Sequence, residues 1–318
     1  MKNNKDIPGQ PLLVILGPTA SGKTHLAVQL AARLKGEIIS ADSRQVYRGM
    51  DIGTGKDLDE YDLGNQKISF HLINIRDAGE KYNLNEFVND FSIVYEKVTG
   101  NNKVPIVCGG TGLYIHALLQ GYGFVKIPVD EHLRMQLDVL DTGELLIKWE
   151  ESGKDLGFPA DISTRKRLIR NIEIAQYLQR YPEEWIELNR QRQFKAVVFG
   201  LIPDVATRRV RISMRLETRL QNGLTEEIER LLSAGIKPEQ LIYYGLEYKY
   251  VTQYMLGILA FDVMKEKLET EIHRFAKRQM TFFRKMERDG IKIHWLDDTM
   301  TENEKIIFVS KTYKAAGQ

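Results

Sequence analysis

The sequence predicts an α/β fold with a mostly parallel sheet and a helical insertion, and three observations lead to this prediction. Short apolar runs typical of buried strands alternate with segments of helical periodicity along much of the 318-residue chain. A glycine-containing turn stands between the first apolar run and the first helical segment. The middle of the chain, by contrast, has helical spacing and no convincing strand pattern.

The strands are predicted from apolar runs of four to eight residues, which parallel sheets bury on both faces. They are expected at residues 11–16, 37–40, 70–75, 104–107 and 197–202, with a weaker candidate at 291–296. Leu26, Leu30 and Leu34 recur at helical spacing after the first strand, and residues 85–98 also read as a helix. Helices between strands imply parallel pairing with both faces of the sheet covered.

A helical insertion domain is expected at residues 128–195, within an α/β core formed by residues 1–127 and 196–318. Leu168, Ile172 and Ala175 mark a helix that is entered at Ser163 or Thr164. The last third of the chain is again mostly helical, and it is rich in arginine and lysine.

The composition is that of an ordinary globular chain, with 43% hydrophobic and 28% charged residues and a net charge of +2. It excludes collagen-like, wholly disordered and coiled-coil proteins. The single cysteine, Cys108, excludes internal disulfides and cysteine-rich zinc sites, and we expect it to be a buried strand residue. We find no signal peptide and no apolar run long enough to span a membrane, so we expect a cytoplasmic protein.

A phosphate-binding loop is predicted between the first strand and the first helix, where the sequence matches G-x-x-x-x-G-K-[ST]. Glycines let the backbone curl so that amide N–H groups point inward, and the following helix adds its positive dipole end. The lysine adds a mobile charge, and the Thr24 hydroxyl can hold Mg²⁺. The pattern therefore predicts polyphosphate binding and a P-loop NTPase-like core. The predicted phosphate-binding residues are Gly17, Pro18, Thr19, Ala20, Ser21, Gly22, Lys23 and Thr24.

Two further polar residues follow predicted strands at the edge where open parallel sheets bind ligands. Asp42 comes just after the second strand, and it could be a magnesium ligand, a general base or a helix cap. Thr111 follows another strand after paired glycines, Gly109 and Gly110, which allow a close backbone approach.

Basic residues gather in three helical segments. Each cluster alone is typical of a solvated surface, but together, on a chain of nearly neutral charge, they suggest contact with a polyanion. The clusters are Arg208, Arg211, Arg215 and Arg219; Lys166, Arg167 and Arg170; and Lys277, Arg278, Arg284, Lys285 and Arg288.

The phosphate loop, together with the block at residues 42–56, resembles the tRNA dimethylallyltransferase family. Three further blocks agree with the family in order, at residues 71–75, 109–114 and 276–284, so that the resemblance runs from about residue 11 to residue 297. It implies transfer of a dimethylallyl group from dimethylallyl diphosphate to N6 of the adenosine immediately 3′ of the anticodon, in tRNAs that read codons beginning with U.

The resemblance also implies the partners. The phosphate loop is expected to hold the diphosphate of the donor, and the core and the insertion to grip the anticodon arm while the target base is flipped out. We expect Mg²⁺ as the cofactor and a monomer as the active state. The residues implied in tRNA binding are Asp42, Ser43, Arg44, Gln45, Arg134, Lys166, Arg167, Leu168, Ile169, Arg170, Lys277, Arg278, Gln279, Met280, Thr281, Phe282, Phe283 and Arg284.

The expected catalytic roles follow from the chemistry. Asp42 accepts the proton as nitrogen attacks the allylic carbon, and Thr111 orients Asp42 or the reacting groups. Lys23, with Arg211 or Arg215, stabilises the charge that grows on the departing diphosphate.

Three alternatives remain open from the sequence. A small-molecule kinase would use the same loop and a carboxylate such as Asp42, although it does not need the basic helices. An adenylate isopentenyltransferase would perform the same chemistry on free AMP or ATP. A nucleic-acid binding module with a relict loop is disfavoured, because Lys23, Thr24, Asp42 and Thr111 are all present.

Overall fold

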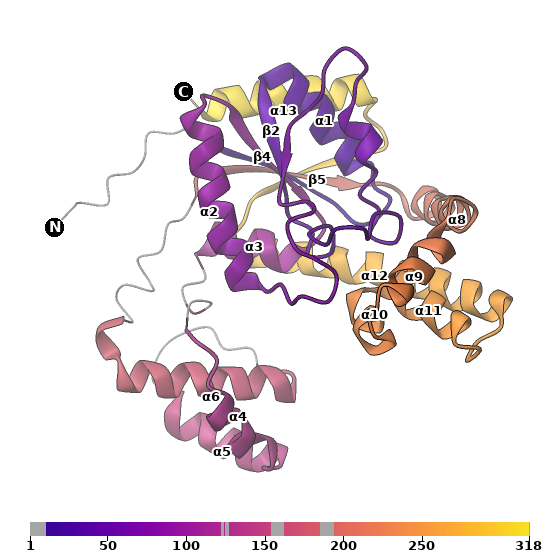
Figure 1. The fold of residues 1–318 in the computed structure, drawn as a ribbon. Helices are drawn as coiled ribbons and strands as arrows, with labels where there is room; N and C mark the ends of the chain where they lie inside the picture. The colour runs from indigo at the N-terminus through magenta and orange to yellow at the C-terminus, as the bar shows by residue number, and fades with distance from the viewer. Residues whose placement is uncertain (1–10, 122–123, 125–126, 154–161, 185–193, 318) are drawn as a thin grey trace. The chain divides into compact units, whose positions relative to one another are not determined.

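The computed structural model describes residues 11–121, 124, 127–153, 162–184 and 194–317 (Figure 1). The chain divides into two compact units, Met1–Leu119 with Phe194–Gln318 and, between them in sequence, Gln120–Gln193. The smaller unit thus spans residues 120–193, where the sequence suggested 128–195.

The larger unit is built on one sheet of six strands in the order β3-β2-β4-β1-β5-β6, with every neighbouring pair parallel. The predicted mostly parallel α/β sheet is therefore confirmed. The strands are β1 (Leu12–Leu16), β2 (Gly36–Ser40), β3 (Phe70–His71), β4 (Val104–Gly109), β5 (Ala196–Ile202) and β6 (Ile293–Asp297). β3 is shorter than the run at 70–75 suggested, because Leu72 and Asn74 adopt left-handed φ angles of 60° and 57° that end an extended strand.

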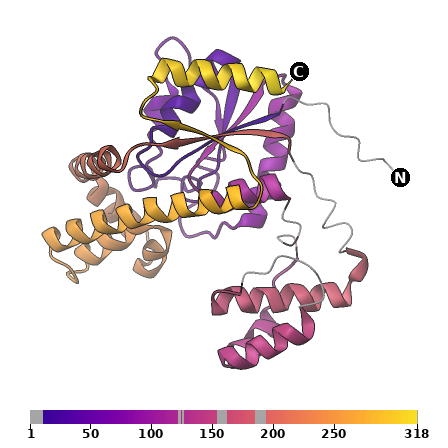
Figure 2. The same ribbon diagram turned by 180° about the vertical axis from the view of Figure 1, so that it is seen from behind.

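Helices cover both faces of this sheet (Figures 1 and 2). On one face, Leu13 and Ile15 of β1 share a core with α1 (Lys23–Leu34) and α13 (Glu302–Ala316). On the other face, the alternate residues of β1 share a core with α2 (Leu84–Gly100), α3 (Gly112–Gln120) and α12 (Phe261–Arg288). This burial on both sides explains why the strands read as continuous apolar runs.

A helical subregion of the same unit follows β5. It consists of α8 (Val205–Gln221), α9 (Leu224–Ser233), α10 (Pro238–Tyr244) and α11 (Leu246–Met255), and α8 and α11 both pack against α12. A short 3₁₀ helix, Leu58–Tyr61, lies against α1. The subregion thereby brings helix faces from late in the sequence to the loops that follow the early strands.

The smaller unit contains α4 (Glu131–Asp138), α5 (Thr142–Ser152) and α6 (Arg165–Arg180). Thr164 caps α6 by accepting a hydrogen bond from the Arg167 N–H, which confirms the predicted helix start. Leu145, Leu168 and Ile172 form its core with at most 1% exposure. Among the described residues of both units, no helix is long and apolar enough to cross a membrane.

Candidate active site

The phosphate loop lies between β1 and α1, as predicted. Ala20 and Gly22 have left-handed φ angles of 59° and 80°, which curl the backbone between the strand and the helix. α1 begins at Lys23, so its free amide groups and the positive end of its dipole face the loop. This geometry is the one that backbone recognition of phosphate requires.

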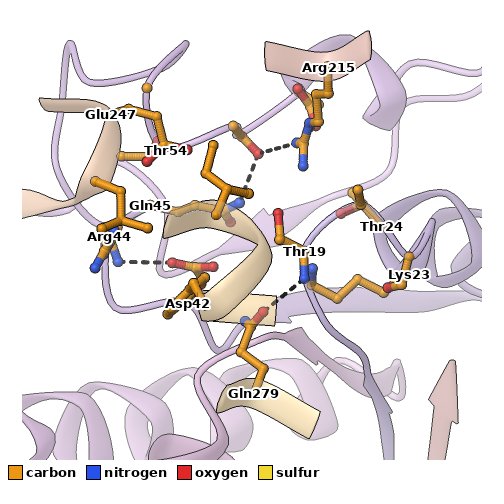
Figure 3. A pocket seen from close by; sticks show the side chains of 18 of the residues that line it. Thr19, Lys23, Thr24, Asp42, Arg44, Gln45, Thr54, Arg215, Glu247 and Gln279 are labelled. Atoms are coloured by element: carbon orange, nitrogen blue, oxygen red, sulfur yellow. Dashed lines mark hydrogen bonds and ion pairs between the residues drawn. The ribbon is translucent and has the colours of Figure 1, made fainter. Parts of the chain in front are cut away.

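A cavity of about 270 Å³ opens beside this loop at the carboxyl edge of the sheet (Figure 3). The loop residues Thr19 to Thr24 share its lining with Asp42, Thr111 and three arginines of α8. The predicted donor site and the predicted catalytic side chains therefore lie in one cavity, although the sequence places them far apart. Arg208, the fourth arginine expected on this helix face, does not line this cavity. It lines a different cavity together with Lys277 and Arg284.

Asp42 projects from the end of β2 without serving as a helix cap. One carboxylate oxygen accepts a hydrogen bond from the Arg44 N–H at 3.0 Å, which closes a local turn, and no helix follows. The helix-cap alternative for Asp42 is therefore wrong. The second oxygen has no hydrogen-bond partner among the described residues and is free to accept a proton from a ligand.

Lys23 lines the cavity and is the cation of the phosphate loop that is expected to contact the diphosphate of the donor. Burial lowers the pKa of its amino group, while the negative charge of Asp42 acts in the opposite direction. An anion in the cavity would favour the charged form of Lys23. Cys108 itself is buried, as expected, and burial raises the pKa of its thiol to about 12.

Thr111 contacts Ser43 in place of Asp42. Its hydroxyl oxygen accepts a hydrogen bond from the Ser43 N–H at 3.1 Å and lies 3.4 Å from the Ser43 hydroxyl. Thr111 thus holds the backbone directly after Asp42. It was expected to orient either Asp42 or the reacting groups, and it makes no direct hydrogen bond to Asp42 among the described residues. Its action on Asp42 runs through the neighbouring residue.

The three cavity arginines differ in their partners. Arg215 pairs with Asp57 and also donates to the Gly55 carbonyl at 3.3 Å, whereas Arg219 pairs with Glu247 at 3.1 Å. Both guanidinium groups lie so close to Gly55 that a Cβ there would overlap them, and Gly55 has a left-handed φ of 63°. A side chain here would have to displace both guanidinium groups and adopt a left-handed φ, which explains the glycine in the block at residues 42–56.

Two buried charged side chains hold the segment at residues 42–56 in place, and the sequence analysis did not identify either of them in this role. Glu227, 1% exposed, accepts hydrogen bonds from three successive backbone N–H groups, those of Asp51, Ile52 and Gly53, and from the Tyr248 hydroxyl. Lys56, also 1% exposed, donates to the Tyr47 carbonyl, Asp51 and Asn74. A charged residue in an amphipathic helix gives no sequence signal that it will be buried against a loop, so Glu227 could not be identified.

The cavity also suits the expected Mg²⁺. Thr24 shares its walls with the carboxylates of Asp42, Asp57 and Glu60, and hard oxygen ligands are those that Mg²⁺ prefers. One oxygen of Glu60 is buried without a hydrogen-bond partner, and burial followed by the neighbouring Asp57 raises the pKa of this carboxyl. Among the described residues no three His, Cys, Asp or Glu side chains are grouped to hold a metal by themselves.

Several residues implied in tRNA binding have side chains that face a core, so these assignments are corrected. Leu168 and Ile169 belong to the core of the small unit, and Met280 and Phe283 anchor α12 to the sheet. Apolar side chains at such spacing are buried by their helices and cannot reach a nucleic acid. The implied residues that are exposed are Lys166, Arg167, Lys277, Arg278, Thr281 and Arg284.

Arg134 and Arg170 have a structural role that the sequence did not indicate. Both pair with Glu173, which is 2% exposed, at 3.0 Å and 2.7 Å. Arg170 also donates to three backbone carbonyls, those of Phe124, Ile127 and Pro128. The two terminal nitrogens of this guanidinium make four hydrogen bonds inside the small unit, which leaves little for a phosphate. Neither a phosphate contact nor a solvated helix face therefore describes Arg170.

The fold and the cavity together define a P-loop protein with an NTPase-like core. The description "IPP transferase" matches residues 45–286, and "Isopentenyl transferase" matches residues 10–74. The chain is 48% identical to tRNA dimethylallyltransferase 2 of Bacteroides fragilis over 97% of its length and 99% of that protein. It is also 48% identical to tRNA dimethylallyltransferase 1 of Parabacteroides distasonis, over 93% and 95% of the two chains.

Solved structures agree. The full-length tRNA isopentenylpyrophosphate transferase of Bacillus halodurans superimposes with a TM-score of 0.70 at 29% identity, covering 97% of each chain. A eukaryotic dimethylallyltransferase acting on tRNA superimposes with a TM-score of 0.77 at 23% identity, over 96% of this chain and 79% of that one, which supports the fold. The chain belongs to the IPP transferase family, and the predicted resemblance is confirmed.

Proposed function

We propose that this protein transfers a dimethylallyl group from dimethylallyl diphosphate to N6 of the adenosine immediately 3′ of the anticodon, in tRNAs that read codons beginning with U. The observation that carries the proposal is the shared cavity of about 270 Å³, in which a phosphate loop and an unpaired carboxylate oxygen of Asp42 lie together. Family membership and relatives named tRNA dimethylallyltransferase support the choice of donor and acceptor.

The reaction divides between the two sides of this cavity. The N6 nitrogen attacks C1 of the allyl group, the C1–O bond breaks, and the diphosphate leaves with the bonding electrons. Adenine N6 is a weak nucleophile because its lone pair delocalises into the ring, so Asp42 accepts the proton released during attack. Thr111 keeps Asp42 in place by holding the Ser43 backbone.

Charge develops on the leaving diphosphate, and the opposite side of the cavity stabilises it. The amides of the phosphate loop, Lys23, Arg211 and Arg215 supply positive charge there. Mg²⁺, bound by the Thr24 hydroxyl with help from the nearby carboxylates, would neutralise further negative charge. Arg215 already pairs with Asp57, so we expect the donor to compete with that carboxylate for the guanidinium.

The acceptor is proposed to be tRNA, gripped by the exposed cations of α12 and α6. Lys277, Arg278 and Arg284 share the exposed side of α12, and Lys166 and Arg167 lie at the start of α6. Exposed positive side chains are what a phosphate backbone recognises. We further propose that the enzyme acts as a monomer in the cytoplasm. Sedimentation of the purified protein would test the oligomeric state, and fractionation of cells would test the compartment.

The test supplies radiolabelled dimethylallyl diphosphate with Mg²⁺ and either unmodified tRNA or AMP. We expect label in tRNA and none in AMP. Label in AMP alone would support an adenylate isopentenyltransferase. ATP consumption without an isoprenoid donor would support a small-molecule kinase.

A further inference from the structure

Gln279 joins two loops of the cavity through the two ends of one amide group. Its side-chain carbonyl accepts a hydrogen bond from the Thr19 N–H at 2.9 Å (Figure 3). Its side-chain NH₂ donates to the Gly110 carbonyl at 2.9 Å. The residue is only 8% exposed. Gln279, which the family resemblance implied in tRNA binding, therefore also contacts the protein backbone on both sides.

The glycine after β4 makes this approach possible. A Cβ on Gly110 would lie 2.4 Å from the Gln279 side-chain nitrogen, which no real Cβ tolerates. A Cβ on Gly112 would meet the Phe282 ring at 2.4 Å. The glycines at positions 110 and 112 thus let α12 dock against the loop, so the close approach expected for this glycine-rich turn is made by a helix of the protein itself.

The two bridged loops carry the opposite halves of the reaction. Thr19 belongs to the phosphate loop, and its N–H is engaged by Gln279 and not directed at the donor. Gly110 immediately precedes Thr111, which holds the Ser43 backbone beside Asp42. A single buried side chain therefore fixes the phosphate loop relative to the segment that positions Asp42.

We propose that Gln279 is a positioning residue that sets the distance between the diphosphate of the donor and Asp42. This inference rests on the proposed function. The amide offers an acceptor and a donor on one planar group, whereas an ionised carboxylate offers acceptors alone and the thioether of methionine supplies neither a donor nor a strong acceptor. Misplacement of reacting groups by about 1 Å costs roughly 10²-fold in rate.

The first variant is Gln279→Met, which keeps the length of the side chain and removes both hydrogen bonds. We expect kcat to fall about 10²-fold, because the two halves of the site lose their fixed separation. The dissociation constant of tRNA should stay within a few-fold of wild type, because the exposed cations of α12 are untouched. A merely structural residue would lower the yield of folded protein and leave kcat of the folded fraction unchanged.

The second variant, Gln279→Glu, adds a readout that loss of packing cannot imitate. The introduced carboxyl still accepts from the Thr19 N–H, but when ionised it faces the Gly110 carbonyl without a proton to donate. Its burial favours the protonated form, which restores the second hydrogen bond. We therefore expect kcat relative to wild type to recover as the pH is lowered.

The control is Met264→Ala on the same helix. Met264 is fully buried and lies fifteen residues before Gln279, about 22 Å along α12 at 1.5 Å per residue. The Met264→Ala variant should lower the stability of the protein without changing either loop. Three results would each overturn the inference. Gln279→Met could keep the wild-type kcat, or lose no more kcat than Met264→Ala does. Gln279→Glu could lose the same fraction of kcat at every pH.

Binding of inorganic pyrophosphate, measured by calorimetry, separates this inference from the proposed function. Failure of the wild-type protein to bind pyrophosphate or to transfer dimethylallyl would contradict the function. Normal wild-type transfer with an equally active Gln279→Met variant would contradict the positioning role alone.

Discussion

Two arginine-rich helices, α8 in the core and α6 in the small unit, have similar spacing and opposite uses. On α8, Arg211, Arg215 and Arg219 line the cavity beside the phosphate loop. On α6, Arg170 turns inward, where with Arg134 it surrounds Glu173. Spacing at three or four residues determines which side chains share a helix face, but the partner depends on carboxylates supplied by other segments.

The carboxylates show the same contrast. Glu173 accepts hydrogen bonds from the Asp130 N–H and from both arginines, so both of its oxygens are satisfied. In the cavity, Asp42 and Glu60 each keep one oxygen without a partner among the described residues. A buried polar atom without a partner, such as the Glu60 oxygen, is costly in a folded protein, so it points to a place where a ligand completes the bonding.

The largest effect is expected where a charge serves chemistry. Asp42→Asn keeps the shape and the turn to Arg44 but cannot accept the proton, so transfer should fall by about 10²–10⁴. Stability and tRNA affinity should remain near wild type, because the carboxylate supports no other element. Single-turnover transfer and filter binding measure the two quantities. A variant with near-normal transfer would reduce Asp42 to a residue of the turn.

The next effect is expected where a charge serves structure. Glu173→Gln leaves two arginines without their counter-charge and should destabilise the small unit by about 2–3 kcal/mol, moderated by the partial exposure of both guanidinium groups. Hydrogen–deuterium exchange in α6 should rise, while pyrophosphate affinity stays unchanged. Glu150→Gln, on the exposed side of α5, is the matched control. Unchanged exchange in Glu173→Gln would contradict the structural role.

This contrast also shows how far the sequence reaches. The strands, the phosphate loop, the start of α6 and the position of Asp42 were predictable, because local periodicity and one short motif determine them. Gln279, Glu227 and Glu173 were not identified in their roles, because each acts on backbone or side chains distant in the sequence. The family block at residues 276–284 marked Gln279 as notable, but its burial on α12 comes from tertiary packing.

Charge state in the cavity gives the third prediction. Burial lowers the pKa of Lys23, and the donor's diphosphate favours the protonated amine. As the pH rises through this lowered pKa, Lys23 loses its charge and pyrophosphate affinity should fall about tenfold, the worth of one charge-assisted hydrogen bond. Lys23→Arg stays charged, so its affinity should change less over the same range, and Lys23→Ala should bind weakly throughout.

The comparison with Lys23→Arg removes the titration of pyrophosphate itself, because both proteins meet the same ligand. Calorimetry from neutral to alkaline pH gives the ratio of the two affinities. A constant ratio would mean that Lys23 stays charged across the range, and that the amides and arginines govern donor affinity.

The smallest effect concerns the exposed cations. If Lys277, Arg284 and Lys166 contact tRNA phosphates, each replacement by Ala should reduce the slope of log affinity against log salt by about one, because one fewer contact releases fewer counterions. Arg170→Ala should leave the slope unchanged and lower the stability of the small unit, because its guanidinium is engaged by Glu173. Lys311→Ala, exposed on α13 at the opposite face of the sheet, is the control.

A slope that falls equally for Arg170→Ala and Lys166→Ala would contradict the distinction between structural and tRNA-binding cations in the small unit. A slope that falls for Lys277→Ala and not for Lys166→Ala would confine tRNA recognition by these helices to the core.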